Sequence, residues 1–203
     1  MTPNSLNPIR ARAQEVLVRE ADAVRAIGEQ IDPETLAQVI DTLFSCEGHV
    51  LVTGAGTSRT VAQRFAHLLS CCGTPALPIS AADCLHGGAG AITARDVVFI
   101  ISKGGRSAEI NQLAAIAKGR GALIIAQTEA PDAPLAQICD AIVQVRTPPD
   151  TDPYGMIATG TSLVNAAMGD VLCVLLLEKR GYSREAFGET HPGGAVGHQL
   201  ASQ

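Results

Sequence analysis

The stretch FIISKGGRSAEI, residues 99–110, joins an apolar run to a helical pattern through a glycine-rich turn. An uninterrupted apolar run is typical of a strand in a parallel sheet that helices cover on both faces. The turn gathers two hydroxyl groups and two cations where this strand ends: Ser102, Lys103, Arg106 and Ser107. A strand, a glycine turn and a helix in this order predict an α/β fold.

The same alternation recurs along most of the chain. The apolar run before the turn is DVVFIIS (96–102), and further short apolar or extended runs are HVLVTGAG (49–56), TPALPIS (74–80), ALIIAQT (122–128) and AIVQV (141–145). Helical patterns separate several of them, namely SRTVAQRFAHLLSCC (58–72) and AEINQLAAIAKGRG (108–121). Strands that are apolar throughout and alternate with helices predict a parallel sheet with helices on both faces.

Helical spacing also extends to both ends of the chain. Residues 8–30 repeat apolar positions opposite a charged face. The sequence DPE at 32–34 resembles the cap of a second helix, which we expect to end near Cys46. Residues 159–180 predict a long helix rich in alanine, leucine and valine, which Gly181 ends.

We predict one domain over residues 1–203, with N-terminal helices in 1–46 and an α/β core with C-terminal helices in 47–203. The helix over 159–180 is apolar nearly all round, and the first helix adds a second apolar stripe. A chain of this size does not easily cover both surfaces by itself, so we predict an obligate oligomer.

Composition excludes several classes of protein. The net charge of -5 favours no nucleic-acid partner, and any anion site has to be local. The six cysteines lack CxxC spacing and are interpreted as reduced thiols of a cytoplasmic protein. The N-terminus shows no apolar leader. The run Val171–Leu177 is too short to span a bilayer, so no membrane partner is expected.

Two glycine turns follow predicted strands and precede predicted helices: GAGTSRT (54–60) and SKGGRS (102–107). Ligands of parallel sheets bind beyond the carboxyl ends of the strands. Helix N-termini, hydroxyl groups and close backbone approach at glycine suit a phosphate or a similar anion. The alternative is that both are ordinary strand-to-helix turns with serine or threonine caps.

Nucleotide and metal cofactors are not expected. A GxGxxG fingerprint would need glycine where Arg59 stands, and the GKS or GKT of a P-loop is missing. Cys84 and His86 lack further ligands at suitable spacing for a metal. We therefore predict a site without a cofactor or metal.

Four motifs together resemble the sugar isomerase (SIS) domain family: VTGAGTS (52–58), AADCLHGGAG (81–90), ISKGGRSAEI (101–110) and THPGGAVG (190–197). The resemblance runs from about residue 30 to the C-terminus. It is strongest to the arabinose 5-phosphate isomerase branch, whose stretches read approximately TGxGKSG, AEAxHGD, ISNSGES and SHPGGALG. Many members carry two CBS modules after the last motif, so we expect a short, SIS-only form.

The resemblance implies a five-stranded parallel sheet flanked by helices, in a flavodoxin- or Rossmann-like three-layer sandwich. It implies aldose–ketose isomerisation of a phosphosugar without a cofactor, in a homotetramer or homodimer with shared active sites. By motif match, the catalytic candidates are His86, His191 and Asp150. His191 is expected to reach a neighbouring subunit's site. The substrate-binding candidates are Gly56, Thr57, Ser58, Ser102, Lys103, Gly104, Arg106 and Ser107.

The turns depart from the family pattern in charge. Thr57 stands where the branch has lysine, and Arg106 stands where ISNSGES has glutamate. Lys103 and Gly104 replace an asparagine and a serine. These changes predict a ligand that carries more negative charge than a simple pentose phosphate.

Two alternatives to a simple phosphosugar isomerase remain open. Isomerisation needs a base that moves a proton between C1 and C2 through an enediol. Gly88 replaces the aspartate of HGD, and Asp150 aligns only roughly with a family glutamate. The chain could therefore be a non-catalytic phosphosugar-binding or regulatory module. It could also be an isomerase or lyase that acts on a doubly anionic sugar acid.

Overall fold

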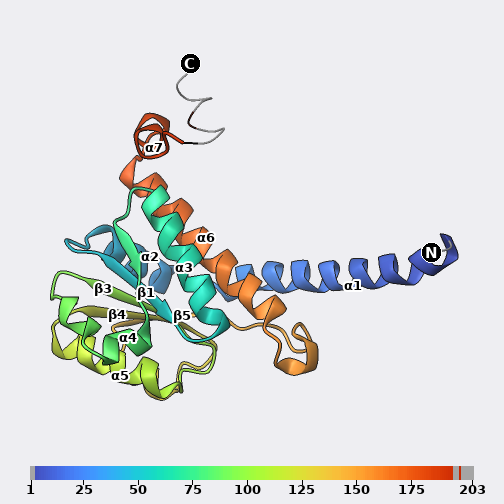
Figure 1. The fold of residues 1–203 in the computed structure, drawn as a ribbon, viewed down its shortest axis with the longest axis horizontal. Helices are drawn as coiled ribbons and strands as arrows, with labels where there is room; N and C mark the ends of the chain where they lie inside the picture. Colours follow the sequence, from blue (N-terminus) through green and yellow to red (C-terminus); the bar gives the residue numbers. More distant parts are fainter. Residues whose placement is uncertain (1–2, 194–196, 198–203) are drawn as a thin grey trace.

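A parallel sheet of five strands forms the centre of the molecule (Figure 1). The computed structural model describes residues 3–193 and residue 197, with side chains from residue 7 onward. The strands are β1 (Val50–Gly54), β2 (Ala76–Pro78), β3 (Val97–Ile101), β4 (Leu123–Thr128) and β5 (Ala141–Gln144). Each lies within a run that the sequence predicts as extended, so the predicted α/β fold is confirmed.

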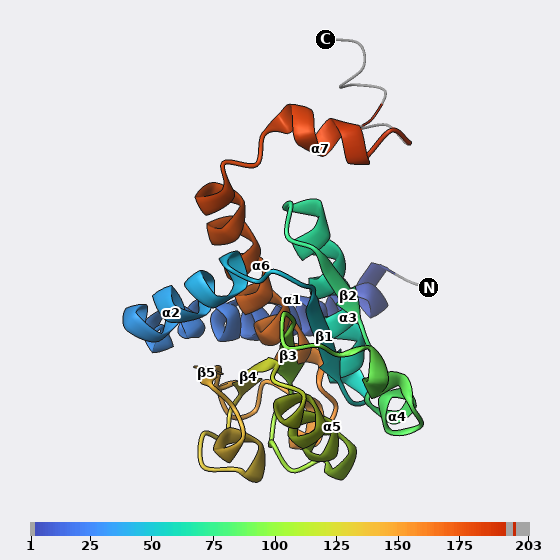
Figure 2. The ribbon, with the colours of Figure 1, turned by 90° about the vertical axis from the view of Figure 1, so that its left-hand side faces the viewer.

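Helices cover both faces of the sheet, as predicted (Figures 1 and 2). One layer contains α1 (Pro3–Ile27), α2 (Pro33–Phe44), α3 (Thr57–Cys71) and α6 (Thr159–Arg180). The other contains α4 (Ala81–Leu85) and α5 (Ala108–Gly119). Strand residues alternate between the two cores: Val50 and Val52 face the first, and Leu51 the second. This alternation produces the expected three-layer sandwich.

The strand order is β2-β1-β3-β4-β5, the flavodoxin-like order. The chain leaves β1 toward one edge and returns on the other side of it as β3. The carboxyl ends of β1 and β3 therefore flank the switch point, where ligands of such sheets bind. Both glycine turns of the sequence lie at these two ends.

Local signals place the helix boundaries. Asp32 accepts a hydrogen bond from the Thr35 amide at 3.1 Å and caps α2, with Pro33 in the first turn. Gly181 adopts φ 58° and ends α6.

The remaining elements of the described chain are short. Four are 3₁₀ helices, namely η1 (Gly28–Gln30), η2 (Gly88–Ala91), η3 (Pro134–Gln137) and η4 (Pro153–Gly155), and the last is α7 (Arg184–Thr190), which follows α6.

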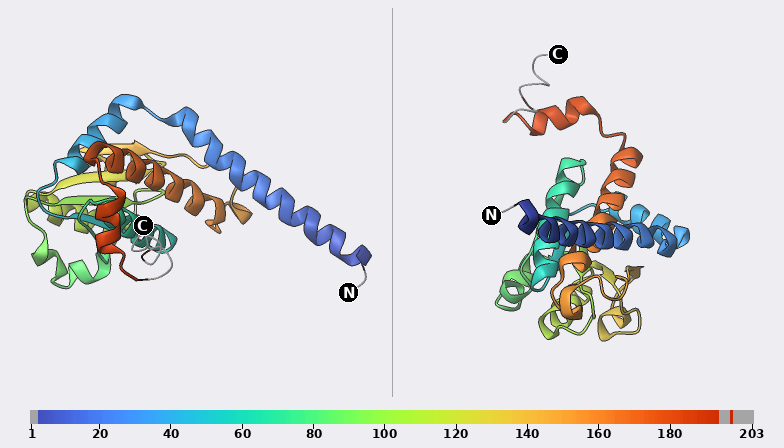
Figure 3. Two further views of the ribbon diagram at one scale, coloured as in Figure 1. Left: turned by 90° about the horizontal axis from the view of Figure 1, so that it is seen from above. Right: turned by 90° about the vertical axis from the view of Figure 1, so that its right-hand side faces the viewer.

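The first and sixth helices are the longest elements. α1 extends away from the sheet as an arm (Figures 1 and 3) and exposes Ile9, Leu17 and Val18. The run Val171–Leu177 is too short to span a bilayer, but the whole of α6 is long and apolar enough to do so. Half of its apolar stretch is buried against the rest of the protein, as in a core helix, so membrane crossing is not supported. The division into a single domain over residues 1–203 stays a prediction.

Candidate functional site

The two glycine turns meet in one cleft at the switch point. Its volume is about 410 Å³, and both turns contribute residues to its wall. The lining is Ala55, Ser58, Ile101, Ser102, Lys103, Gly104, Gly105, Arg106 and Ser107. Six of the eight predicted substrate-binding residues are in this wall. Gly56 and Thr57, the other two, are exposed at the start of α3 and are not in it.

Neither helix that starts at the cleft is capped by a side chain. Gly56 is the N-cap of α3 and has no side chain to offer. Ser107 is the N-cap of α5, but its hydroxyl makes no capping hydrogen bond. Both helix N-termini thus lack a side-chain acceptor and add partial positive charge, although the Ser58 and Arg59 amides of α3 donate to the carbonyls of Ala55 and Gly56. This finding argues against ordinary capped turns and favours an anion site.

Ser102 supplies a buried hydroxyl group to the cleft. The residue is 7 % exposed, and its Oγ accepts a hydrogen bond from the Gly105 amide at 3.2 Å. Within residues 7–193, no acceptor is recorded for the proton of this hydroxyl. A buried donor without an acceptor is costly, so a ligand oxygen in the cleft would stabilise it.

Gly105 holds the second turn in a fixed shape. Its φ is 60°, and a Cβ there would lie 2.8 Å from the Cβ of Ala133. Its carbonyl accepts hydrogen bonds from Asn111 Nδ2 and from the Leu135 amide, both at 3.3 Å. The turn is therefore tied to α5 and to the segment after β4, which keeps its hydroxyl groups aimed at the cleft.

The charge of Lys103 is already paired. Its Nζ donates to Asp152 Oδ2 at 3.2 Å and to Thr161 Oγ1 at 3.1 Å. Asp152 is 6 % exposed and also accepts from the amide of Thr161 at 2.9 Å, near the start of α6. Burial alone would raise the pKa of Asp152, but the hydrogen bonds from Thr161 and the Lys103 ammonium hold the pKa below its ordinary value.

Arg106 is the other cation of the turn, and its surroundings differ. The residue is exposed and lines the cleft. In the part of the chain that the structure describes, no carboxylate lies within ion-pair distance of its guanidinium. The described residues that line the cleft include no aspartate or glutamate either. The free positive charge of the cleft therefore comes from Arg106.

His86 lies at the end of α4, where its amide donates to the carbonyl of Asp83 at 3.0 Å. The residue is exposed, and no hydrogen bond of its ring to another described side chain is recorded. α4 packs against α5, which begins at the cleft. The structure thus presents the His86 ring to solvent next to an element of the site, and its catalytic role stays a prediction.

His191 lies far from the cleft of its own chain. Its Nε2 is 3.4 Å from Cys71 Sγ, and its ring stacks on Phe187 at 3.7 Å. Cys71 is the last residue of α3, whereas Ser58 lies in the first turn. At 1.5 Å per residue, the two are separated by about 20 Å along the helix. Figure 2 shows α7 beyond the C-terminal end of α6.

Asp150 and Asp152 differ in environment although they are two residues apart. Asp150 is exposed with φ 64°, and its carbonyl accepts from Arg19 at 3.1 Å. The carboxylate that contacts the cleft turn is that of Asp152, through Lys103. No local pattern indicates this contact or that of Thr161, because both partners are distant from the turn in the chain. Gly194, Ala195 and Val196 of the THPGGAVG motif lie outside the described residues.

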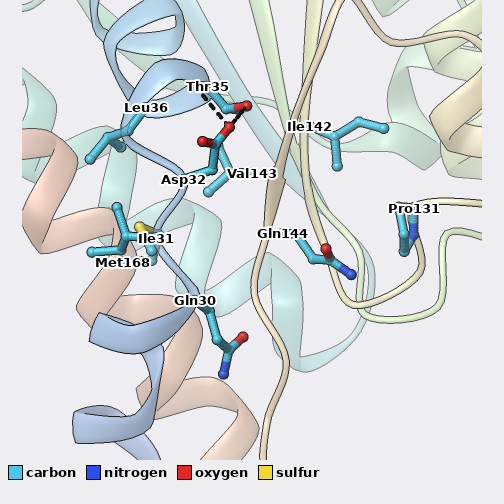
Figure 4. Close-up of a pocket in the computed structure, with 10 residues that line it drawn as sticks. All are labelled: Gln30, Ile31, Asp32, Thr35, Leu36, Pro131, Ile142, Val143, Gln144 and Met168. Atoms are coloured by element: carbon cyan, nitrogen blue, oxygen red, sulfur yellow. Dashed lines mark hydrogen bonds between the residues drawn. The ribbon is translucent and has the colours of Figure 1, made fainter.

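A second cavity, of about 220 Å³, lies between the start of α2 and the edge strand β5 (Figure 4). Its polar groups are used within the protein. Asp32 caps α2, and Gln30 exchanges hydrogen bonds with the backbone of Arg146 at 2.8 and 2.9 Å. None of the described residues that line it is a lysine or an arginine. The second cavity is therefore not suited to an anion.

Comparisons with known proteins agree with this fold. The family model described as SIS domain matches residues 43–185, and the chain belongs to the SIS domain family. Arabinose 5-phosphate isomerase KdsD of Pseudomonas aeruginosa is 34 % identical over 188 residues, which cover 93 % of this chain and 57 % of KdsD. Arabinose 5-phosphate isomerase KpsF of Escherichia coli is 30 % identical over 190 residues, covering 94 % and 58 %. The chain thus spans less than two thirds of the length of these relatives.

Solved structures are similar over nearly the whole chain. A Listeria monocytogenes protein, provisionally assigned as a sugar-phosphate isomerase, superposes with a TM-score of 0.88 at 30 % identity. A protein of Escherichia coli CFT073 in complex with arabinose 5-phosphate superposes with a TM-score of 0.85 at 28 % identity. Each comparison covers 95 % of this chain and all of the other.

Proposed function

We propose that the protein catalyses aldose–ketose isomerisation of a phosphosugar, as an oligomer and without a cofactor. The observation that carries the proposal is the meeting of two uncapped helix N-termini and the buried Ser102 hydroxyl in one cleft. These groups suit the phosphate of an open-chain sugar. The relatives named arabinose 5-phosphate isomerase support the same class of substrate.

Phosphate binding fixes one end of the sugar and leaves C1 and C2 toward the mouth of the cleft. Ser58, Ser102 and Ser107 donate to the phosphate through their hydroxyl groups, together with the first-turn amides of α5. Gly56 and Thr57 lie next to this contact at the start of α3. The hydroxyl groups and amides need no change of protonation state to bind, so binding is separate from the chemistry.

The chemical step moves one proton. A base takes the proton from C2 of the aldose, an enediol forms, and the proton returns to C1 while the hydroxyl proton moves from O2 to O1. We assign ring opening or polarisation of the carbonyl to His86 or His191. Asp150 or one of these histidines serves as the base. Substrate and product have the same composition, so no other reactant is required.

If His191 is catalytic, its position requires a site shared between subunits. In its own chain the ring lies about 20 Å along α3 from the cleft, too far to contact the same substrate. It can take part only if α7 of one subunit reaches the cleft of another. A homodimer or homotetramer is therefore part of the proposal.

The test follows the C2 proton directly. Candidate phosphosugars, with arabinose 5-phosphate first, are incubated with the protein in D₂O, and deuterium at C2 and C1 is measured by NMR. We expect exchange and interconversion with the ketose for at least one sugar, and loss of both in the His86→Ala variant. Binding of the sugars without exchange would contradict an isomerase.

One observation favours a second candidate, a non-catalytic phosphosugar-binding module. No carboxylate lines the described cleft, and the nearest buried one, Asp152, is held by three hydrogen bonds. Such a module would bind phosphosugars with the same groups. The exchange experiment separates the two functions, because a binding module shows a saturable affinity and no deuterium uptake.

A further inference from the structure

We infer that the ligand carries a carboxylate in addition to its phosphate, and that Arg106 binds this carboxylate. This inference rests on the proposed phosphosugar site and names the class of ligand that the site selects. The charge that the cleft offers a ligand is the charge that no ion pair within the protein neutralises. Two cations follow β3, and within the described residues only one of them is free.

Lys103 contributes little charge to a ligand. Asp152 accepts from its ammonium and is itself buried and ionised. Thr161 takes a second hydrogen bond from the same ammonium. Because a lysine ammonium has three donors, at most one remains for a ligand. Lys103 therefore mainly links the cleft turn to the start of α6.

Arg106 has no such partner among the described residues. It is exposed at the cleft wall, and no carboxylate of that part of the chain pairs with it. A phosphate is already served by the serine hydroxyls and the two helix N-termini. The unused guanidinium therefore matches a second anionic group. Its planar pair of N–H donors fits the two oxygens of a carboxylate through parallel hydrogen bonds.

The cleft is large enough for such a ligand. About 410 Å³ falls within the usual size of small-molecule pockets. The described wall also offers no carboxylate that would repel a second negative charge. A phosphosugar that also carries a carboxylate and keeps its C1 aldehyde satisfies both halves of the site and can still be isomerised, whereas a simple pentose phosphate leaves Arg106 without a partner.

A matched pair of open-chain ligands tests the inference by calorimetry. The compounds 6-phosphogluconate and glucitol 6-phosphate share the phosphate and the carbon chain, and they differ in a carboxylate against a hydroxymethyl group at C1. Neither is an isomerase substrate, so the result does not depend on turnover. We expect the wild type to bind 6-phosphogluconate about tenfold or more tightly than glucitol 6-phosphate, the scale of a charge-assisted pair.

Variants locate the effect. Arg106→Gln should remove the preference for 6-phosphogluconate and leave the affinity for glucitol 6-phosphate nearly unchanged. Arg106→Lys should keep part of the preference, because the positive charge stays but the planar pair of N–H donors is lost. Arg95→Gln is the matched control: it removes the same charge from an exposed arginine at the other end of β3, before the strand begins, and should keep the preference.

Three results would overturn the inference. They are equal affinity of the wild type for the two ligands, an equal loss for both in Arg106→Gln, and no binding of either ligand. The first two leave phosphosugar binding intact. The third also removes the phosphate site on which the proposed function depends. Absence of C2 exchange with every phosphosugar that binds would instead defeat the isomerase activity and leave the carboxylate preference standing.

Discussion

The ammonium of Lys103 lies 3.2 Å from Asp152 Oδ2, so the cleft turn is joined to a carboxylate 49 residues further along the chain. Asp152 also accepts from the amide and hydroxyl of Thr161 in the first turn of α6. A buried polar chain continues from there, because Asn165 donates to the carbonyl of Thr161 and accepts from Gln127 of β4. The cleft is thus supported from α6 as well as from its own strands.

Removing the Asp152 charge should loosen this support. Asp152→Asn keeps the shape of the side chain but leaves the Lys103 ammonium without its carboxylate. We expect the free energy of unfolding to fall by about 1–2 kcal/mol at neutral pH, since the lysine side chain is 43 % exposed and its pairing is partly screened. Urea denaturation measures the change. Asp150→Asn, an exposed neighbour, should change it by less than about 0.5 kcal/mol.

The same pair predicts how this contribution depends on pH. The folded pKa of Asp152 lies below the ordinary value of 3.8, so the contribution is fully present above about pH 5 and is lost as the pH falls through the folded pKa. The difference in unfolding free energy between wild type and Asp152→Asn should therefore be constant near neutral pH and shrink below about pH 4. A difference that grows toward low pH would contradict the assigned ion pair.

Neighbouring glycines of the turn should respond differently to alanine. Gly105→Ala introduces a Cβ at φ 60° and 2.8 Å from the Cβ of Ala133, so we expect a loss of about 2–3 kcal/mol in unfolding free energy and weaker phosphosugar binding. Gly104 has open space around it and should tolerate alanine within about 0.5 kcal/mol. Thermal and urea unfolding of both variants decides this. Equal losses would contradict the described turn.

Two histidines should matter for activity and a third should not. His86→Ala and His191→Ala are each expected to lower kcat/KM by on the order of a hundredfold or more, as for groups that assist proton transfer. His67 lies on the exposed side of α3 near its C-terminal end and outside the four family motifs, so His67→Ala should have a much smaller effect. Steady-state kinetics measures all three. A larger loss for His67→Ala would mean that the motifs are misassigned.

Mixed oligomers test whether His191 serves another subunit. His191→Ala is co-expressed with Ser58→Asp, which places a negative charge in the phosphate cleft. If sites are shared in a dimer, half of the molecules are mixed and each holds one intact site, so activity should return to about a quarter of the wild-type value. Either variant alone should be nearly inactive. Co-expression that restores nothing would place His191 outside the shared site.

The exposed apolar side of α1 predicts a contact between subunits. Ile9 and Leu17 are 56 % and 65 % exposed and lie eight residues apart, on one side of the helix. Changing both to aspartate should lower the oligomeric mass measured by light scattering. Gln14→Asp, an exposed polar position on the same helix, should leave the mass unchanged. A stable, active wild-type monomer at micromolar concentration would contradict the oligomer.

The sequence by itself determined the elements and their order. Apolar runs, helical spacing, the DPE cap and the final Gly181 are local signals, because they reflect preferences of a few consecutive residues. They placed β1 to β5, α2, α5 and α6 within a few residues of their observed bounds. They also placed both glycine turns at the ligand-binding edge, since parallel strands bring their carboxyl ends to one edge.

Only the tertiary structure decided how the charged residues are used. Lys103 and Arg106 are alike in sequence as cations of one turn, but Asp152 pairs with the first and no described carboxylate pairs with the second. The distance of His191 from the cleft of its own chain likewise depends on how α7 packs at the end of α3. Such contacts join residues dozens of positions apart, so the packing of the three layers, and no local pattern, determines them.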